Sequence, residues 1–267
     1  MTIRSSILQK TIYAILKISG WKKNVLYDNL DYVYPEMNTS EKKNFYKKLI
    51  KNLSQDSADF LTRSWIYRKN DSRFSIDEKS VPVLEKMKRG GLMLTAHFEN
   101  YEALGPWLIR LGIPLVASYA KLKPEIFDKW IHSKFRSIDN CNYSLFINNP
   151  RNILRLLEND KLFCLIGDQD FRKSHFILGK FLEKNVHCNP IPAFILKYRP
   201  KTPIYICWLK SNFQTKKLFA KEIQASDGEE IFLKYHQWLE EKIHLSPEKW
   251  YGWIHRRFLS TKGKCFT

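Results

Sequence analysis

From residue 80 onward, short β-rich runs alternate with helical patterns, and this alternation constrains the fold more than any other feature of the chain. Alternation at this spacing is typical of a three-layer α/β fold with a mostly parallel central sheet. The expected strands are 90–97, 113–119, 144–147, 161–168, 202–209 and 217–223. The expected helices are 101–111, 124–137, 150–160 and a closing helix that starts at 228 and stops near Pro247.

The chain before this region has a helical pattern. Residues 39–70 read as a helix with a cap region at 39–41, and residues 5–21 form an amphipathic helix with Leu8, Ile12 and Ile15 on one face. Such a helix either covers its own core or lies in a membrane interface, which the flanking Lys22 and Lys23 favour. We therefore predict a helical segment 1–75, packed on an α/β core at 76–267.

The composition limits the possible partners and compartments. The 267 residues carry a net charge of +18, which attracts nucleic acid, anionic lipid or an acidic protein, although base composition of the genome also explains a Lys-rich chain. Five widely spaced cysteines without a C-x-x-C pair predict reduced thiols in the cytosol. No run approaches the roughly 18 to 20 apolar residues that span a bilayer, and no signal peptide is expected.

Just after the strand at 90–97, the stretch TAHFENYEALG places His97 and Glu102 five positions apart. If Asn100 caps a helix that begins near Tyr101, the carboxylate of Glu102 can reach back to the imidazole. Such a pair deprotonates a hydroxyl, and the alternative is an isolated polar pair at a strand end. His97 and Glu99 also fit the start of a zinc-deaminase motif, but no P-C-x-x-C or H-E-x-x-H occurs, so we predict neither a metal nor a cofactor.

Two further stretches strengthen the catalytic interpretation. CLIGDQDFRKS at 164–174 follows another apolar strand, and PEKWYGWIHRRF at 247–258 lies near the C-terminus. Together with HFENYEALG they resemble the bacterial lipid A biosynthesis (late or secondary) acyltransferases, whose pattern is H-F-x-N-W-E, D-Q, P-E-x-W and W-x-H-x-R. NLDYVYPEMNTSEKKNF is also similar to that family, so the resemblance covers about residues 22–259.

The resemblance implies a glycerolipid-acyltransferase-like fold at the cytoplasmic face of the inner membrane. There the enzyme would move a fatty acyl chain from acyl carrier protein to a hydroxyl of a lipid A precursor, with His97 as general base and Glu102 as its orienting partner. Asp168 and Gln169 would form a second polar wall of the site, or Asp168 would only cap a turn. The predicted substrate-binding residues are Asp168, Gln169, Lys121, Lys123, Arg136, Arg172, His255 and Arg256, although the charges at 121, 123 and 136 also read as solvated.

The chain departs from the family pattern at several positions. Glu99 stands where the family usually has glycine, Tyr101 replaces tryptophan, Ala120 replaces an arginine, and the span between Trp250 and His255 is one residue longer. These departures are typical of a divergent member with a different acceptor. The alternatives are an acyltransferase for lysophospholipid or another glycolipid, and a basic nucleic-acid-binding protein, although no RNP, KH, zinc-finger or helix-turn-helix signature occurs. The expected partners are acyl carrier protein, the acceptor lipid and an anionic membrane surface, and not nucleic acid.

Overall fold

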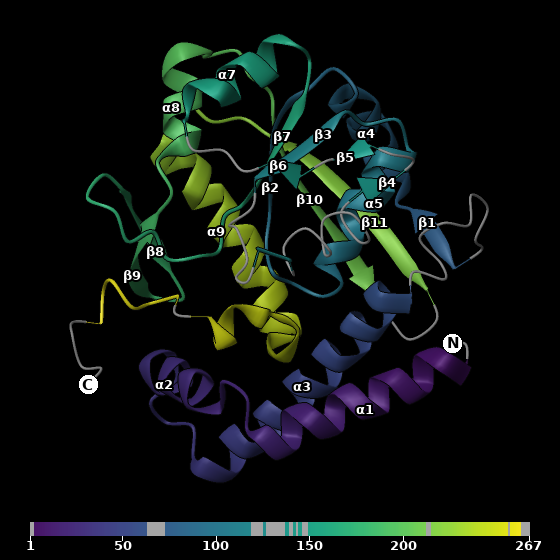
Figure 1. Ribbon diagram of the computed structural model, residues 1–267. Helices are drawn as coiled ribbons and strands as arrows, with labels where there is room; N and C mark the ends of the chain where they lie inside the picture. The colour runs from purple at the N-terminus through teal and green to yellow at the C-terminus, as the bar shows by residue number, and fades with distance from the viewer. Residues whose placement is uncertain are drawn as a thin grey trace.

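A seven-stranded sheet forms the centre of the molecule (Figure 1). The computed structural model describes residues 3–62, 73–118, 125–126, 137–138, 141–142, 144–145, 149–211, 215–255 and 257–262. In spatial order the strands are β1 (Phe74–Ile76), β11 (Lys216–Ile223), β10 (Ile204–Ser211), β2 (Gly91–Thr95), β7 (Leu162–Ile166), β3 (Leu115–Ser118) and β6 (Ser144–Leu145). The β10–β11 pair is antiparallel and the other pairs of this sheet are parallel, so the predicted mostly parallel sheet is confirmed.

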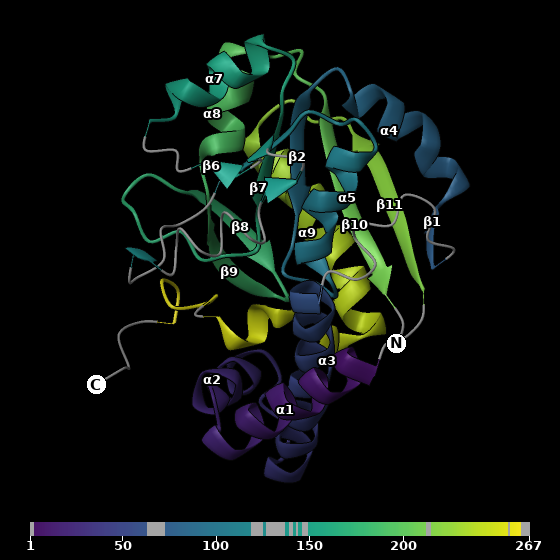
Figure 2. The same cartoon turned by 45° about the vertical axis from the view of Figure 1, so that its right-hand side comes forward.

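Helices cover both faces of the sheet (Figure 2). Alternate side chains of β2 point to opposite faces, with Leu92 and Leu94 in one buried cluster and Met93 in the other. The first cluster packs against α7 (Arg151–Glu158), α8 (Ile191–Tyr198) and α9 (Gly228–Leu245), and the second against α4 (Val81–Met87) and α5 (Leu104–Arg110). Both faces are therefore buried, which explains why the central strands read as continuous apolar runs.

Several elements differ from the sequence prediction. The expected helix at 101–111 begins as a 3₁₀ turn, η2 (Tyr101–Ala103), and Asn100 does not cap it, because its amide donates to Asp59 instead. The expected helix at 124–137 lies mostly outside the described residues, and Ser137 belongs to a short hairpin of β4 (Ser137–Ile138) and β5 (Cys141–Asn142). The closing helix α9 ends at Leu245, two residues before Pro247, as expected.

The sequence did not predict the hairpin that β8 (Ile177–Phe181) and β9 (Lys184–Cys188) form. Its two turn residues, Leu182 and Glu183, have φ angles of 48° and 60°. Such turns are normally recognised by Asn-Gly or Asp-Gly, because these residues tolerate the left-handed region. The missing turn signature is the physical reason why the hairpin was not predicted.

Three N-terminal helices lie together at the end of the sheet where β2 and β10 stop: α1 (Ile3–Ser19), α2 (Lys23–Val33) and α3 (Thr39–Thr62) (Figures 1 and 2). The helix α3 begins with a capping box, in which Asn38 Oδ1 accepts from the backbone of Ser40 and Glu41 while the Glu41 carboxylate accepts from Asn38 N. The cap is thus Asn38 rather than the predicted residues 39–41. The division of the chain at residue 75 stays a prediction.

Of the three residues that we expected on the apolar face of α1, Ile15 is exposed to solvent. Leu8 and Ile12 are half-buried, while Ile7 (62% exposed), Ile15 (60%), Ile18 (87%) and Trp21 (40%) point outward. Tyr13 and Leu16 of α1 pack against the core cluster that includes α3. Because Tyr13 and Leu16 provide the packing on the body, the apolar side chains open to another surface are Ile7, Ile15 and Ile18. Within the described residues, no helix is long and apolar enough to cross a membrane.

Candidate functional site

The register of β2 and β7 brings His97 next to Asp168. Thr95 pairs with Ile166 in this parallel ladder, and His97 and Asp168 each follow two residues later. Their side chains therefore meet at the carboxyl end of the sheet, which is where α/β enzymes usually bind their ligands. Both side chains are buried, with relative exposures of 6% for His97 and 1% for Asp168.

Asp168 accepts three hydrogen bonds. Its Oδ1 lies 2.7 Å from His97 Nδ1, and its Oδ2 accepts from the His97 backbone N–H at 2.9 Å and from Trp250 Nε1 at 2.8 Å. Burial by itself raises the pKa of Asp168, but the charge of His97 and these hydrogen bonds outweigh it and hold the pKa well below its usual range. Asp168 is thus an ionised carboxylate at neutral pH.

An ionised Asp168 determines the protonation of the imidazole. A carboxylate can only accept, so Nδ1 carries the hydrogen that it donates to Asp168, and Nε2 of the neutral ring keeps its lone pair. The amide nitrogen of Gln169 lies 3.4 Å from this Nε2 and must present N–H to it. Gln169 is exposed, so the Nε2 lone pair faces an accessible side chain.

Two more rings surround His97. Tyr101 lies with its ring centroid 4.7 Å from the imidazole, and His255 lies at 4.8 Å. Burial, together with the nearby His97, lowers the pKa of His255 to about 4. His255 is therefore neutral at pH 7, which avoids a second positive charge next to the imidazolium that forms when His97 takes a proton.

The contact that we expected from Glu102 is made by Asp168. Glu102 lies in η2, half-buried, and its role as orienting partner stays a prediction. Gln169 and His255 do lie against His97, whereas Arg172 is exposed on the loop after β7. The remaining predicted substrate-binding residues, Lys121, Lys123, Arg136 and Arg256, lie outside the described residues.

The C-terminal segment completes the site. Tyr251 N donates to the carbonyl oxygen of His97 at 2.7 Å, and Phe98 forms an isolated β-bridge with Trp250. On the other side of this segment, Asn29 of α2 donates to the carbonyl oxygens of Trp253 (2.9 Å) and His255 (2.8 Å). The sequence analysis did not assign a role to Trp250, although its place in the P-E-x-W motif marked it.

Glu99, two residues after the base, occupies a strained backbone position. Its φ is 49°, in the left-handed region that favours glycine. The carboxylate accepts from Lys249 Nζ at 2.9 Å and from the backbone N–H of Ser211. It lines a cavity of about 180 Å³ whose walls are formed by Asn52, Gln55, Asp56, Glu99, Ser211, Lys249 and Tyr251.

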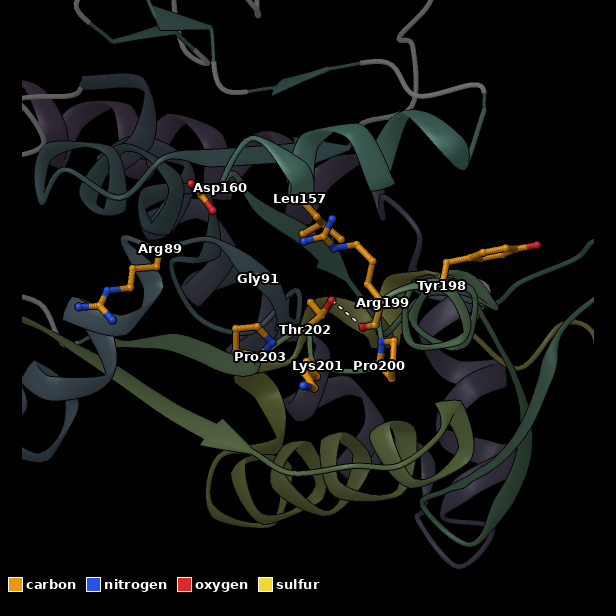
Figure 3. A pocket seen from close by; sticks show the side chains of 10 residues that line it. All are labelled: Arg89, Gly91, Leu157, Asp160, Tyr198, Arg199, Pro200, Lys201, Thr202 and Pro203. Carbon is orange, nitrogen blue, oxygen red and sulfur yellow. Dashed lines mark hydrogen bonds between the residues drawn. The ribbon is translucent and has the colours of Figure 1, made fainter.

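A larger cavity, of about 400 Å³, lies at the opposite edge of the sheet (Figure 3). It is lined by Gly91 at the start of β2 and by residues 198–203 before β10, together with Arg89, Leu157 and Asp160. The length of β2 separates it from His97, so it does not belong to the His97 site.

The described residues contain no group of three or more His, Cys, Asp and Glu side chains arranged to hold a metal ion. Three cysteines, Cys164, Cys188 and Cys207, are buried free thiols. Burial raises the pKa of Cys164 to about 12 and also raises that of the other two. These thiols are protonated at neutral pH and are poor nucleophiles.

A buried His–Asp pair whose Nε2 lies toward Gln169, at the carboxyl end of a parallel sheet, is an arrangement that can perform general-base chemistry. The sequence profile of one family, the bacterial lipid A biosynthesis acyltransferases, matches residues 3–260. The chain belongs to this family, and it is therefore assigned as an acyltransferase. Among curated proteins, none matches the chain.

Proposed function

We propose that the protein transfers a fatty acyl chain from acyl carrier protein to a hydroxyl of a lipid A precursor or a similar glycolipid, with His97 as the general base. The observation that carries this proposal is the hydrogen bond between His97 Nδ1 and Asp168, which leaves Nε2 as the acceptor. Membership of the lipid A acyltransferase family supports the acyl transfer and the type of acceptor.

In this reaction the acceptor hydroxyl displaces the Gln169 amide from His97 Nε2. The imidazole takes the hydroxyl proton while the oxygen attacks the thioester carbonyl, and Asp168 stabilises the imidazolium. The tetrahedral intermediate then collapses, the carbon–sulfur bond breaks, and the thiolate receives the proton from the imidazolium. Transfer is direct and needs no acyl-enzyme.

The basic surface supports the proposed partners. Acyl carrier protein, a phosphorylated acceptor and the cytoplasmic face of the inner membrane are all negatively charged, and a net charge of +18 attracts each of them. The outward face of α1, with Ile7, Ile15 and Ile18 beside Lys10 and Lys17, supports peripheral binding at that membrane.

The proposal is tested with the purified full-length protein, acyl carrier protein loaded with a labelled acyl chain, and vesicles that contain a lipid A precursor. Wild type should release the acyl carrier protein thiol and label the acceptor, while folded His97→Ala should lose roughly 10²- to 10⁴-fold in turnover. A His97→Ala protein that keeps more than about a tenth of wild-type turnover would contradict the base assignment.

Two further experiments test the alternative functions. Replacing the acceptor by a lysophospholipid tests the nearer alternative, and lipid mass spectrometry of cells with and without the gene identifies the natural product. Labelling of lysophospholipid alone would assign the chain to that reaction instead. The more distant alternative, nucleic-acid binding, is tested at the scale of the whole molecule below.

A further inference from the structure

The cavity lined by Asp56 and Glu99 lies against the backbone of the catalytic base. Its wall residue Tyr251 donates its N–H to His97 O at 2.7 Å, and Glu99 N donates to Lys249 O at 2.9 Å. Any group that fills this cavity is thus held beside the loop that carries His97. Because it lies outside the His97 and Asp168 contacts, it can select a substrate without taking part in proton transfer.

The lining combines donors and acceptors. The carboxylates of Asp56 and Glu99 accept, Lys249 donates, and the amides of Asn52 and Gln55 do both. Sugar hydroxyls also donate and accept, so they match such a lining. A phosphate would face two carboxylates, and an ammonium group would face Lys249 and could only donate. The volume, about 180 Å³, is below that of pockets for drug-sized ligands and suits one small ring.

Asp56 is the lining group whose lost solvation such a ligand would replace most. It accepts a hydrogen bond from the Tyr251 hydroxyl, and Lys216, Asp59 and Glu99 act on it at longer range. Burial raises the pKa of Asp56 to about 7, because the half-buried carboxylate is partly removed from water and the acids around it oppose its charge. A hydroxyl donor would replace part of the lost solvation.

Glu99 forms one wall of the cavity from a strained backbone position. A non-glycine residue at φ 49° is strained, yet glutamate stands there and points its carboxylate at Lys249 and Ser211 N. Glycine at this position would keep the backbone conformation but remove one wall of the cavity. Strain of this kind is typical of functional positions.

We propose that the Asp56–Glu99 cavity binds an uncharged sugar ring of the acceptor and so determines which glycolipid is acylated. Asp56 and Glu99 accept hydrogen bonds from its hydroxyls, and Lys249 donates to one of them. The inference rests on the proposed function, because it assigns the acceptor of that reaction, but sugar binding can be measured without turnover.

The test is saturation-transfer NMR on the full-length protein with N-acetylglucosamine as the probe. Wild type and His97→Ala should both bind it, and Asp56→Asn and Glu99→Gly should each bind about tenfold more weakly, as expected for the loss of a hydrogen bond to a charged group. Asp160→Asn, which changes the separate 400 Å³ cavity at a position of positive φ that asparagine tolerates, should bind like wild type.

Undiminished binding by both Asp56→Asn and Glu99→Gly, or no binding by wild type at millimolar sugar, would overturn the inference. Glu99→Gly keeps the test valid if Asp56→Asn does not fold, because glycine suits that backbone. A second readout is pH: wild-type binding should strengthen from pH 6 to 8 as Asp56 ionises, and Asp56→Asn should lack this change. If sugar binding behaves as stated but no acyl chain is transferred, the proposed function fails, and of the inference only the assignment of the cavity as a sugar site stands.

Discussion

At the scale of single residues, the three donors that converge on Asp168 make the result of Asp168→Asn specific. Asparagine has one acceptor oxygen, and the orientation that satisfies both His97 N and Trp250 Nε1 turns its NH₂ toward His97 Nδ1. Nδ1 must then accept, so the hydrogen moves to Nε2 and the base is lost. We expect roughly a 10²- to 10⁴-fold loss of turnover, with the tautomer change visible in the ¹⁵N shifts of His97.

Glu102→Gln is the variant to compare with Asp168→Asn. It also replaces a carboxylate by an amide, in the segment just after Asn100. If Glu102 orients His97, Glu102→Gln should lower turnover nearly as much as Asp168→Asn does. The two variants are compared by turnover and by the His97 ¹⁵N spectrum in the same preparation. A normal tautomer and normal turnover in Glu102→Gln would leave Asp168 as the orienting residue.

Buried histidines should make the protein sensitive to mild acid. Burial and the nearby Arg257 lower the pKa of His236 to about 3, below the value of about 6.5 for an unfolded histidine. The unfolded state therefore binds this proton first, so the contribution to stability is complete above pH 6.5 and is lost as the pH falls toward 3. Between pH 6.5 and 4, the free energy of unfolding of His236→Asn should fall less steeply than that of wild type, measured by urea unfolding.

The control is His244→Asn, which changes an exposed histidine of the same helix, α9. It should keep the wild-type slope. Equal slopes for wild type and His236→Asn would show that His236 is not the group that titrates. Asparagine is chosen because its amide can replace the hydrogen bond from His236 Nδ1 to Lys180 O.

At the scale of secondary-structure elements, the two faces of α1 should respond differently to charge. Ile15→Asp and Ile18→Asp change the outward face, so the fold should persist while binding to anionic vesicles falls. Ile12→Asp changes a half-buried position and should lower the thermal midpoint instead. Vesicle flotation and thermal unfolding of the three variants separate these effects, and vesicle binding that survives both outward changes would exclude this face.

At the scale of the whole molecule, the net charge of +18 fits both a membrane enzyme and a nucleic-acid-binding protein, so salt dependence alone cannot distinguish them. Competition can. Wild type should float with vesicles that contain anionic lipid even in the presence of duplex or single-stranded nucleic acid, and deletion of residues 3–21 should weaken flotation. Tight, structure-selective binding of nucleic acid without any vesicle binding would favour the rival.

The sequence by itself determined the class of fold and the place of His97 at the end of a strand. Apolar runs of strand length between helical patterns suffice for a buried parallel sheet, because both faces must be covered, and a polar motif directly after such a run falls at the carboxyl edge. The strands expected at 90–97 and 161–168, and the position of His97 just after the first of them, follow from these local patterns. The β8–β9 hairpin does not, because its turn residues carry no local signal.

The partners of His97 were decided by the tertiary structure. Glu102 is close in the chain, whereas Asp168 reaches His97 only because Thr95 and Ile166 are paired in the sheet, and a register is a property of two distant segments. The same holds for Trp250, which donates to Asp168 across 82 positions of sequence, and for Asp56, which enters the cavity from α3. Short-range patterns show which side chains stand at the ends of elements, but only long-range packing decides which of those ends meet.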